Sequence, residues 1–328
     1  MNPAQLEGAD NVVLPFAVEA LDVRGRVVRL GTAVDTILAR HAYPDTVARV
    51  LGEAAALTAL LGASLKFEGR FQLQTKSDGP IEMIVVDFDA PDRLRAYARF
   101  NDERLAALAG SNPRTGELLG QGILAMTIDQ GSEMSRYQGV VPLEGGGFEE
   151  AAHQYFRQSE QIPTRVRLAV AEEFAEGRRA YRAGGLLIQF LPTSPERARQ
   201  ADLHPADIPD DHPSHGIEQG EDDAWLEAKA LVDTIEDHEI VDPSVSSERL
   251  LYRLFHERGV RVFDGQPVQE ACRCSHERIM GMMKNFGPED RRHMVGDNGR
   301  VVVTCEFCSR VYDLDPAQIE REIDEAGA

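Results

Sequence analysis

The four cysteines are the most unevenly placed residues of this 328-residue chain. Cys272 and Cys274 form a C-x-C pair, and after thirty intervening residues Cys305 and Cys308 form a C-x-x-C pair. Four thiolate sulfurs are the complete inner ligand set of a structural zinc ion. They are equally two pairs of neighbouring thiols that can oxidise. The spacing leaves both chemistries open, and the choice between them determines what the protein does.

The C-x-C spacing is unusual for a purely structural zinc site, because ligand pairs in such sites are typically separated by two to four residues. A disulfide within C-x-C closes a small strained ring, and strained disulfides tend to be labile or regulatory. Arg273, Arg278 and Arg310 flank the sulfurs and favour the reactive thiolate. His276 and His293 are possible substitute ligands, but four cysteines already complete the shell, so we expect both at the surface.

The overall charge of the chain argues against nucleic-acid binding, which is a common use of zinc modules. The chain has 35 basic and 55 acidic residues, a formal net charge of −20, which repels phosphate backbones, so we expect no nucleic-acid partner. No apolar run approaches the roughly 18 residues of a membrane span, and the N-terminal residues lack the pattern of a secretory signal. We therefore expect a cytoplasmic protein without membrane association. In a reducing cytosol, clustered cysteines indicate metal ligands or sensing thiols.

The pattern along the chain predicts an α+β fold with three parts. A large N-terminal domain of mixed sheet and helix covers residues 1–192, an acidic loop and helical linker covers 193–263, and a small zinc-binding domain covers 264–328. Within the first domain we expect strands at 12–21, 25–30, within 69–100, and at 118–128, 136–143, 165–170 and 184–191. We expect helices at 32–41, 45–65 and 147–159.

The linker changes character along its length. Residues 194–223 contain four prolines, a strong acidic excess and almost no large apolar residues, which predicts a disordered or loosely held segment. Residues 224–258 regain helical periodicity in two apolar stripes separated by Asp242-Pro243. Two helices are too few to bury their own apolar faces, so they must pack on another part of the chain.

The cysteine segment itself predicts a metal-stabilised fold. Residues 301–304 lead into Cys305 and residues 310–312 lead out of Cys308, which indicates a hairpin with the metal at its tip. A short helix is expected to begin near Gly287-Pro288. A segment of about 60 residues with a thin core needs an additional stabilising cross-link. Structural zinc typically contributes an apparent free energy of about 10–16 kcal/mol to folding. Oxidation of the thiols would remove the ligands, and we expect residues 194–260 to unfold and uncover apolar surface.

At this point the sequence resembles the redox-regulated 33 kDa chaperonin family, heat shock protein 33. The C-x-C-S of residues 272–275 and the C-x-x-C of residues 305–308 match its zinc motif. Matching stretches also occur at 97–100, 136–141, 155–165 and 183–189, and the Gln-Ser-Glu-Gln-x-Pro-Thr-Arg part of 155–165 is the most specific. The resemblance covers nearly the whole chain.

The resemblance implies a holdase chaperone rather than an enzyme. In the reduced form Cys272, Cys274, Cys305 and Cys308 would bind one zinc ion and the protein would be inactive. Peroxide or hypochlorite would form Cys272–Cys274 and Cys305–Cys308 disulfides, release zinc and activate binding of unfolding client proteins by a homodimer. The chain departs from the family where Ser309 replaces an expected glycine, and where residues 194–223 resemble an insertion.

Two alternatives come from other classes of protein. One is a protein with a constitutive structural zinc module that binds a partner. The unusual C-x-C spacing argues against it. The other is a thiol–disulfide oxidoreductase, whose C-x-x-C normally opens a helix in a βαβ unit. Here the C-x-x-C lies in strand-like sequence, which argues against that enzyme.

Overall fold

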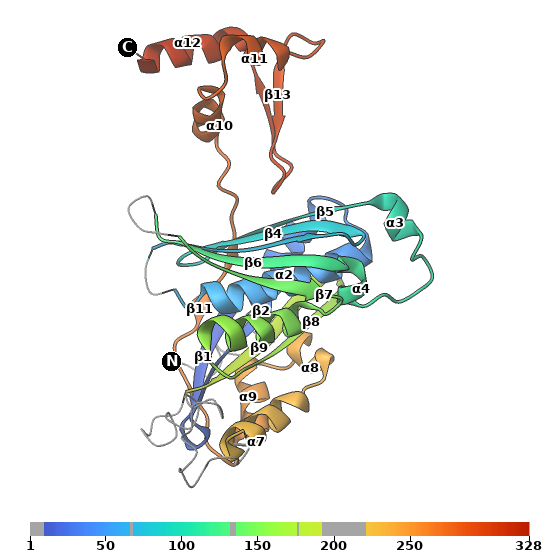
Figure 1. Ribbon diagram of the computed structural model, residues 1–328, viewed down its shortest axis with the longest axis vertical. Helices are drawn as coiled ribbons and strands as arrows, with labels where there is room; N and C mark the ends of the chain where they lie inside the picture. Colours follow the sequence, from blue (N-terminus) through green and yellow to red (C-terminus); the bar gives the residue numbers. More distant parts are fainter. Residues whose placement is uncertain (1–9, 66–67, 132–135, 176, 192–220, 328) are drawn as a thin grey trace, which may run out of the picture. The chain divides into compact units, whose positions relative to one another are not determined.

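The computed structural model describes residues 10–65, 68–131, 136–175, 177–191 and 221–327 (Figure 1). Most of the acidic stretch 194–223 lies outside these ranges, so its expected disorder stays a prediction. The chain divides into two compact units. The larger comprises residues 1–38 and 43–270, and the smaller comprises residues 39–42 and 271–328. Each unit is described by itself.

The larger unit contains two six-stranded sheets. The first, sheet A, has its strands in the order β10-β1-β2-β9-β8, with β11 also paired to β1. Its strands are β1 (Val12–Val18), β2 (Val23–Leu30), β8 (Thr164–Ala175), β9 (Arg178–Phe190), β10 (Arg261–Val262) and β11 (Gln266–Pro267). All pairings within this sheet are antiparallel.

The second sheet, sheet B, has the order β12-β5-β4-β3-β6-β7. Its strands are β3 (Arg70–Ser77), β4 (Ile81–Asp89), β5 (Arg93–Phe100), β6 (Gln121–Asp129), β7 (Tyr137–Glu144) and β12 (Gln269–Glu270). Only the β12–β5 pairing is parallel. The expected strands of residues 69–100 and 136–143 are confirmed, and the mixed sheet and helix content confirms the predicted α+β class.

Helix α2 (Asp45–Gly62) is the centre of this unit, since it packs against strands of both sheets. The apolar periodicity of residues 45–65 predicts a helix buried along one stripe, but the structure buries α2 on nearly every side. Alanines and Gly62 make this close packing possible, because a Cβ at Gly62 would lie 2.5 Å from the Phe88 ring. The remaining helices of residues 10–160 are α1 (Thr32–Ala39), α3 (Asp102–Ala106), α4 (Thr115–Leu119) and α5 (Phe148–Tyr155), the last continued by a π-helical turn (Phe156–Glu160).

The first hairpin corrects one detail of the sequence prediction. The sequence pattern, with strands at 12–21 and 25–30, predicts a turn near Arg24-Gly25. The chain instead turns through a 3-10 helix (Glu19–Leu21) and Asp22, whose φ is +51°. Gly25 lies inside β2, opposite Phe16. A Cβ at Gly25 would come within 2.3 Å of the Phe16 ring. The glycine therefore marks a close packing contact, which a sequence pattern does not distinguish from a turn.

Three helices cover the face of sheet A that lies opposite α2. They are α7 (Asp223–Asp233), α8 (Asp237–Val241) and α9 (Ser247–Phe255), where the sequence predicted two helices. Their apolar residues and those of the sheet form one buried cluster, in which the rings of Phe16 and Phe255 lie 5.9 Å apart and those of Phe190 and Trp225 6.0 Å apart. The expectation that these helices must pack on another part of the chain is thus confirmed.

Polar contacts at the rim of this helical layer also hold it to the sheet. Arg165 pairs with Asp233 at 2.6 Å, and Arg167 with Asp237 at 2.9 Å. The buried Arg29 donates to the carbonyl oxygens of Glu239 at 2.6 Å and of Asp242. The ion pairs are partly exposed and each contributes little, so the apolar cluster supplies most of the attachment.

Residues 261–270 form an extended segment that we call the strap. It pairs with β1 through β10 and β11, and with β5 through β12. The backbone N–H of Val268 donates to the carbonyl of Asn11 at 2.7 Å, and that of Gln269 donates to the carbonyl of Asp92 at 2.8 Å. The strap therefore joins one edge strand of each sheet.

The smaller unit has a thin core. It contains α10 (His276–Met283), α11 (Pro288–His293), the hairpin β13 (Val301–Thr304) and β14 (Val311–Leu314), and α12 (Pro316–Gly327). The expected helix after Gly287 is confirmed as α11, whereas α10 and α12 were not predicted. Its buried cluster has only six members: Ile279, Met280, Met283, Val301, Leu314 and Ile319. Arg291 is buried and pairs with Glu320 at 2.6 Å.

We predict that Phe255→Ala loosens the helical layer in the reduced protein. The side chain is fully buried, and truncation of a buried Phe costs about 3–5 kcal/mol. Urea unfolding followed by the fluorescence of the single Trp, Trp225, should show a lower midpoint. Tyr252→Ala on the same helix is the control, since Tyr252 is 66% exposed and should change stability by less than about 0.5 kcal/mol. Equal effects of both substitutions would contradict the packing role.

Candidate metal centre

Two separate turns of the smaller unit bring the cysteines together. Cys272 and Cys274 lie in the irregular segment before α10, whose first turn is capped by the Ser275 hydroxyl accepting from the N–H of Arg278 at 3.2 Å. Cys305 and Cys308 lie in the turn between β13 and β14, so the expected hairpin with the pair at its tip is confirmed. The first pair, in contrast, lies in an irregular segment that directly precedes a helix.

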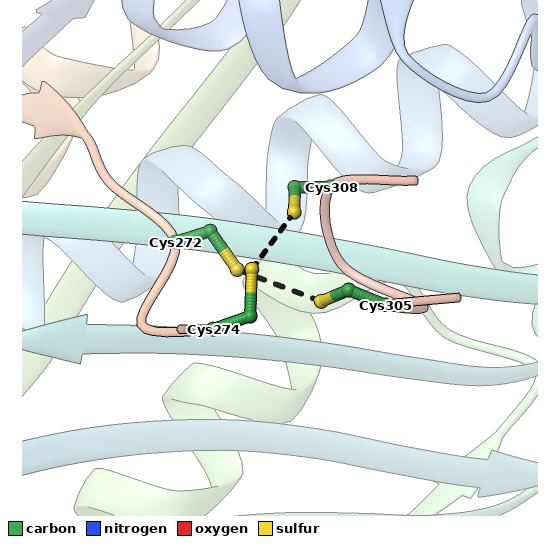
Figure 2. Close-up of side chains that lie close together, drawn as sticks. All are labelled: Cys272, Cys274, Cys305 and Cys308. Carbon is green, nitrogen blue, oxygen red and sulfur yellow. Dashed lines mark hydrogen bonds between the residues drawn. The ribbon is translucent and has the colours of Figure 1, made fainter. Parts of the chain in front are cut away.

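The four sulfur atoms face one another (Figure 2). All four Sγ atoms lie within 4.8 Å of each other, with Cys272 3.7 Å from Cys305 and Cys274 3.3 Å from Cys308. Four sulfurs at about 2.3 Å from a tetrahedral zinc ion are separated by about 3.8 Å. The cluster therefore has the donor atoms and the dimensions that zinc requires, and it can hold a metal ion.

The turn that carries the second pair is closed by its own backbone. The N–H of Ser309 donates to the carbonyl of Cys305 at 2.8 Å, and the N–H of Cys305 donates to the carbonyl of Arg310 at 2.9 Å. Ser309 has a φ of +56°, in the left-handed region. A residue with a Cβ is strained there by about 1–2 kcal/mol, which gives a physical reason for the glycine expected at this position.

The electrostatics of the cluster differ among its thiols. Burial raises the pKa of Cys274, but the interactions with Tyr312 and with the neighbouring thiols outweigh burial and lower this pKa to about 7. Burial raises the pKa of Cys305 and of Cys308, and for Cys308 the neighbouring thiols raise it further. Without a metal, a negative charge on the cluster is therefore most stable on Cys274.

Two histidines and one tyrosine lie near the cysteines in the sequence, and only the tyrosine interacts with the cluster. His276 and His293 are exposed, as expected, and neither belongs to the group of residues that can hold a metal in the described part of the chain. Tyr312 was not singled out from the sequence. It lies on β14, and its interaction with Cys274 raises the pKa of Tyr312. Its place four residues after Cys308 on a strand is too weak a pattern to reveal such a role.

The fold and the site define a two-unit α+β protein: two sheets pack around a buried helix in the larger unit, and a four-cysteine cluster lies in the thin-cored smaller unit. Comparison with known proteins identifies the family. The family model described as Hsp33 protein matches residues 11–315. A 33 kDa chaperonin of Caulobacter vibrioides is 47% identical over 309 residues, which cover 94% of this chain and 95% of the relative. A 33 kDa chaperonin of Ectopseudomonas mendocina is 36% identical, with 95% of both chains covered.

The chain therefore belongs to the Hsp33 family, as the resemblance predicted. A crystal structure of a 33 kDa chaperonin from Thermotoga maritima has the same fold, with a TM-score of 0.70, 19% sequence identity and coverage of 97% of this chain and 99% of that one. The relatives are named chaperonins, which are not enzymes, in agreement with the expectation of a non-enzymatic protein. No helix among the described residues is long and apolar enough to cross a membrane.

We predict that Cys272→Ser or Cys305→Ser weakens zinc binding strongly, because four sulfurs fill the coordination shell. Loss of an outer-shell partner alone typically costs 10–100-fold in affinity, so loss of a ligand should raise the zinc dissociation constant by more than about 100-fold. Competition with a chromogenic chelator measures this constant. His276→Ala is the matched control, since His276 is exposed and should leave affinity unchanged. An unchanged constant in either cysteine variant would defeat the prediction.

The lowered pKa of Cys274 predicts its reactivity in the metal-free, reduced protein. A thiol with a pKa of about 7 is half ionised at that pH, so its alkylation rate should rise through pH 6–8 and level off above it. Cys308, whose pKa is raised, should react slowly over the same range. Iodoacetamide labelling quantified by peptide mass spectrometry measures both rates. Faster labelling of Cys308 than of Cys274 at pH 7 would refute the assignment.

Proposed function

We propose that this protein is a redox-regulated holdase, inactive when reduced and zinc-bound and active when oxidised and zinc-free. The observation that carries the proposal is the four-cysteine cluster in a unit with only six buried apolar residues. Such a unit depends on its metal for folding, because a core of this size stabilises little. Membership of a family whose relatives are named chaperonins supports the chaperone part of the proposal.

In the proposed resting state, Cys272, Cys274, Cys305 and Cys308 bind one zinc ion as thiolates. Under oxidative stress, Cys272 forms a disulfide with Cys274, and Cys305 with Cys308. Each disulfide removes two electrons from two thiolates, and one peroxide or hypochlorite molecule accepts them and is reduced. A disulfide sulfur is a far poorer zinc ligand than a thiolate, so oxidation releases the metal.

Loss of the metal is proposed to unfold the smaller unit and then to release the helices α7–α9. These helices cover a face of sheet A that includes Phe16, Leu186 and Ile188. Exposure of such a face would create a large apolar patch, which is the kind of surface that binds unfolding proteins. The high negative charge of the chain would keep the activated form soluble.

The finer parts of this proposal concern the domains, partners and location. We propose a core domain at residues 1–192, a linker at 193–263 and a zinc switch domain at 264–328, with a homodimer as the active form. Clients are unfolding proteins rather than nucleic acids, and the location is the cytoplasm, where reduced thiols keep the zinc site loaded at rest.

One experiment on the full-length protein separates this function from its rivals. Zinc content, free thiols and suppression of aggregation of a chemically unfolded model protein are measured before and after peroxide treatment at elevated temperature. We expect loss of about one zinc and four thiols together with a gain of chaperone activity. Peptide mass spectrometry should find the disulfides within each pair. Constant activity in both states would indicate a constitutive zinc module, and repeated turnover of a small disulfide would indicate an oxidoreductase.

We further predict that hydrogen exchange in residues 224–260 accelerates on activation, because α7–α9 lose their packing surface. Residues 45–62 of α2 provide an internal control, since they are buried between the two sheets and should stay protected. If the helical layer remains as protected in the oxidised, zinc-free protein as in the reduced one, unmasking of sheet A is not the activating step.

A further inference from the structure

The outer edge of β1 is covered only lightly. Among the described residues, its partners on that side are β10 and β11, strands of two residues each. Residues 263–265 between them add one backbone hydrogen bond, from the N–H of Phe263 to the carbonyl of Pro15 at 3.0 Å. Val262 and Phe263 are 42% and 44% exposed. The strap therefore protects a strand edge by short, interrupted pairing.

The hydrogen-bonding groups that β1 offers on this edge follow from the same contacts. The carbonyls of Asn11 and Pro15 both accept from the strap. The N–H and C=O of one residue in an extended strand point to the same side, so residues 11, 13, 15 and 17 face the strap. Asn11 lies before β1, and proline has no N–H, so within β1 itself the amides of Val13 and Ala17 are the donors of this edge.

The strap also packs loosely where it crosses the face of β1. A cavity of about 440 Å³ lies between β1, the loop before α9 and the strap. Its apolar lining includes Val12, Leu14, Val245, Val262 and Phe263. Val12 and Leu14 lie in one row on β1, and this row would become accessible when the strap and α9 leave. An added extended segment could cover this apolar row.

We propose that the outer edge of β1 is a β-addition site, at which an extended segment of an unfolding client pairs with β1 in place of the strap. The proposal rests on the proposed function, since the strap must leave before the edge opens. The strap indicates the chemistry of the ligand: an extended chain that pairs through its backbone and places apolar side chains such as Val262 beside Phe16. Backbone pairing is independent of side-chain identity, which suits a chaperone for many clients.

Pro15 favours a client over a second copy of this chain as the occupant. An open strand edge pairs readily with the same edge of a second copy of the chain, and a proline on the edge commonly prevents this pairing. If two β1 edges paired about Pro15, both strands would lack an N–H donor at the centre of the pairing. If a client segment without proline paired with β1, only the β1 strand would lack that donor. The edge is therefore disfavoured for self-association and still competent for addition of a foreign strand.

Residue-resolved amide exchange on the oxidised, zinc-free, full-length protein tests the site. Reduced, carboxymethylated α-lactalbumin serves as a permanently unfolded probe. Without it, the amides of Val13 and Ala17 should exchange fast, while alternate residues of β1 stay protected by β2. With the probe bound, both amides should become at least about 10-fold slower. Fast exchange of both amides while the probe is retained on gel filtration would overturn the proposal.

Ala17→Pro provides a matched substitution. It adds a second proline whose missing N–H, like that of Pro15, lies on the outer edge of β1. Removal of one hydrogen bond of about 0.5–1.5 kcal/mol should weaken probe binding about 2–10-fold. Ala17→Ser keeps the N–H and should bind like the natural protein. Equal affinity of both variants would contradict β-addition. If Ala17→Pro does not fold, the exchange measurement decides alone.

The outcomes also separate this site from the proposed function. Oxidised natural protein that loses zinc and binds no probe would defeat the holdase function itself. Probe binding with unprotected β1 amides would defeat only the β-addition site. Protection that appears without the probe and increases with protein concentration would identify a second copy as the occupant, and it would equally refute the proposal.

Discussion

The four-sulfur cluster is the contact on which the smaller unit depends. Hairpin, helices and the irregular segment at Cys272 bury only six apolar residues together, too few to offset the conformational entropy of nearly sixty residues. A metal held by sulfurs from these two separate turns would supply the missing free energy in one place. A fold with its stability concentrated in this way would be lost as a whole if the ligands were oxidised, whereas a well-packed core would lose only one interaction.

The larger unit has the opposite distribution of stability. Its central helix α2 is buried between two sheets, and close contacts such as Gly62 against Phe88 leave no room for rearrangement. The other face of sheet A is covered by three short helices, which are held by one apolar cluster and exposed ion pairs. Helices of 5–11 residues have little intrinsic stability, so they remain folded only while docked. The packing therefore makes α7–α9 the part of this unit that would separate first, while the sheets around α2 would stay folded.

Much of this organisation could be predicted from the sequence because its signals are local. The hydrophobic periods located most strands and α2, and the cysteine spacing identified the cluster and the hairpin tip. The misses have long-range causes. The sequence around Gly25 predicts a turn, because only the contact of Gly25 with Phe16 reveals its packing role. The strap strands are two residues long and carry no periodicity. The influence of Tyr312 on Cys274 depends on how β14 meets the other turn.

The strap is the segment through which unfolding of the smaller unit could affect the strand edge of β1 in the larger unit. It ends at Glu270, two residues before Cys272, and its three pairings with β1 and β5 are two residues each. Such short pairings are favoured because α9, which precedes the strap, is docked on sheet A and lowers the entropy cost of each pairing. If α7–α9 detached, as proposed, this anchor would be lost. The edge of β1 would then open as a consequence of chain entropy, without a separate trigger.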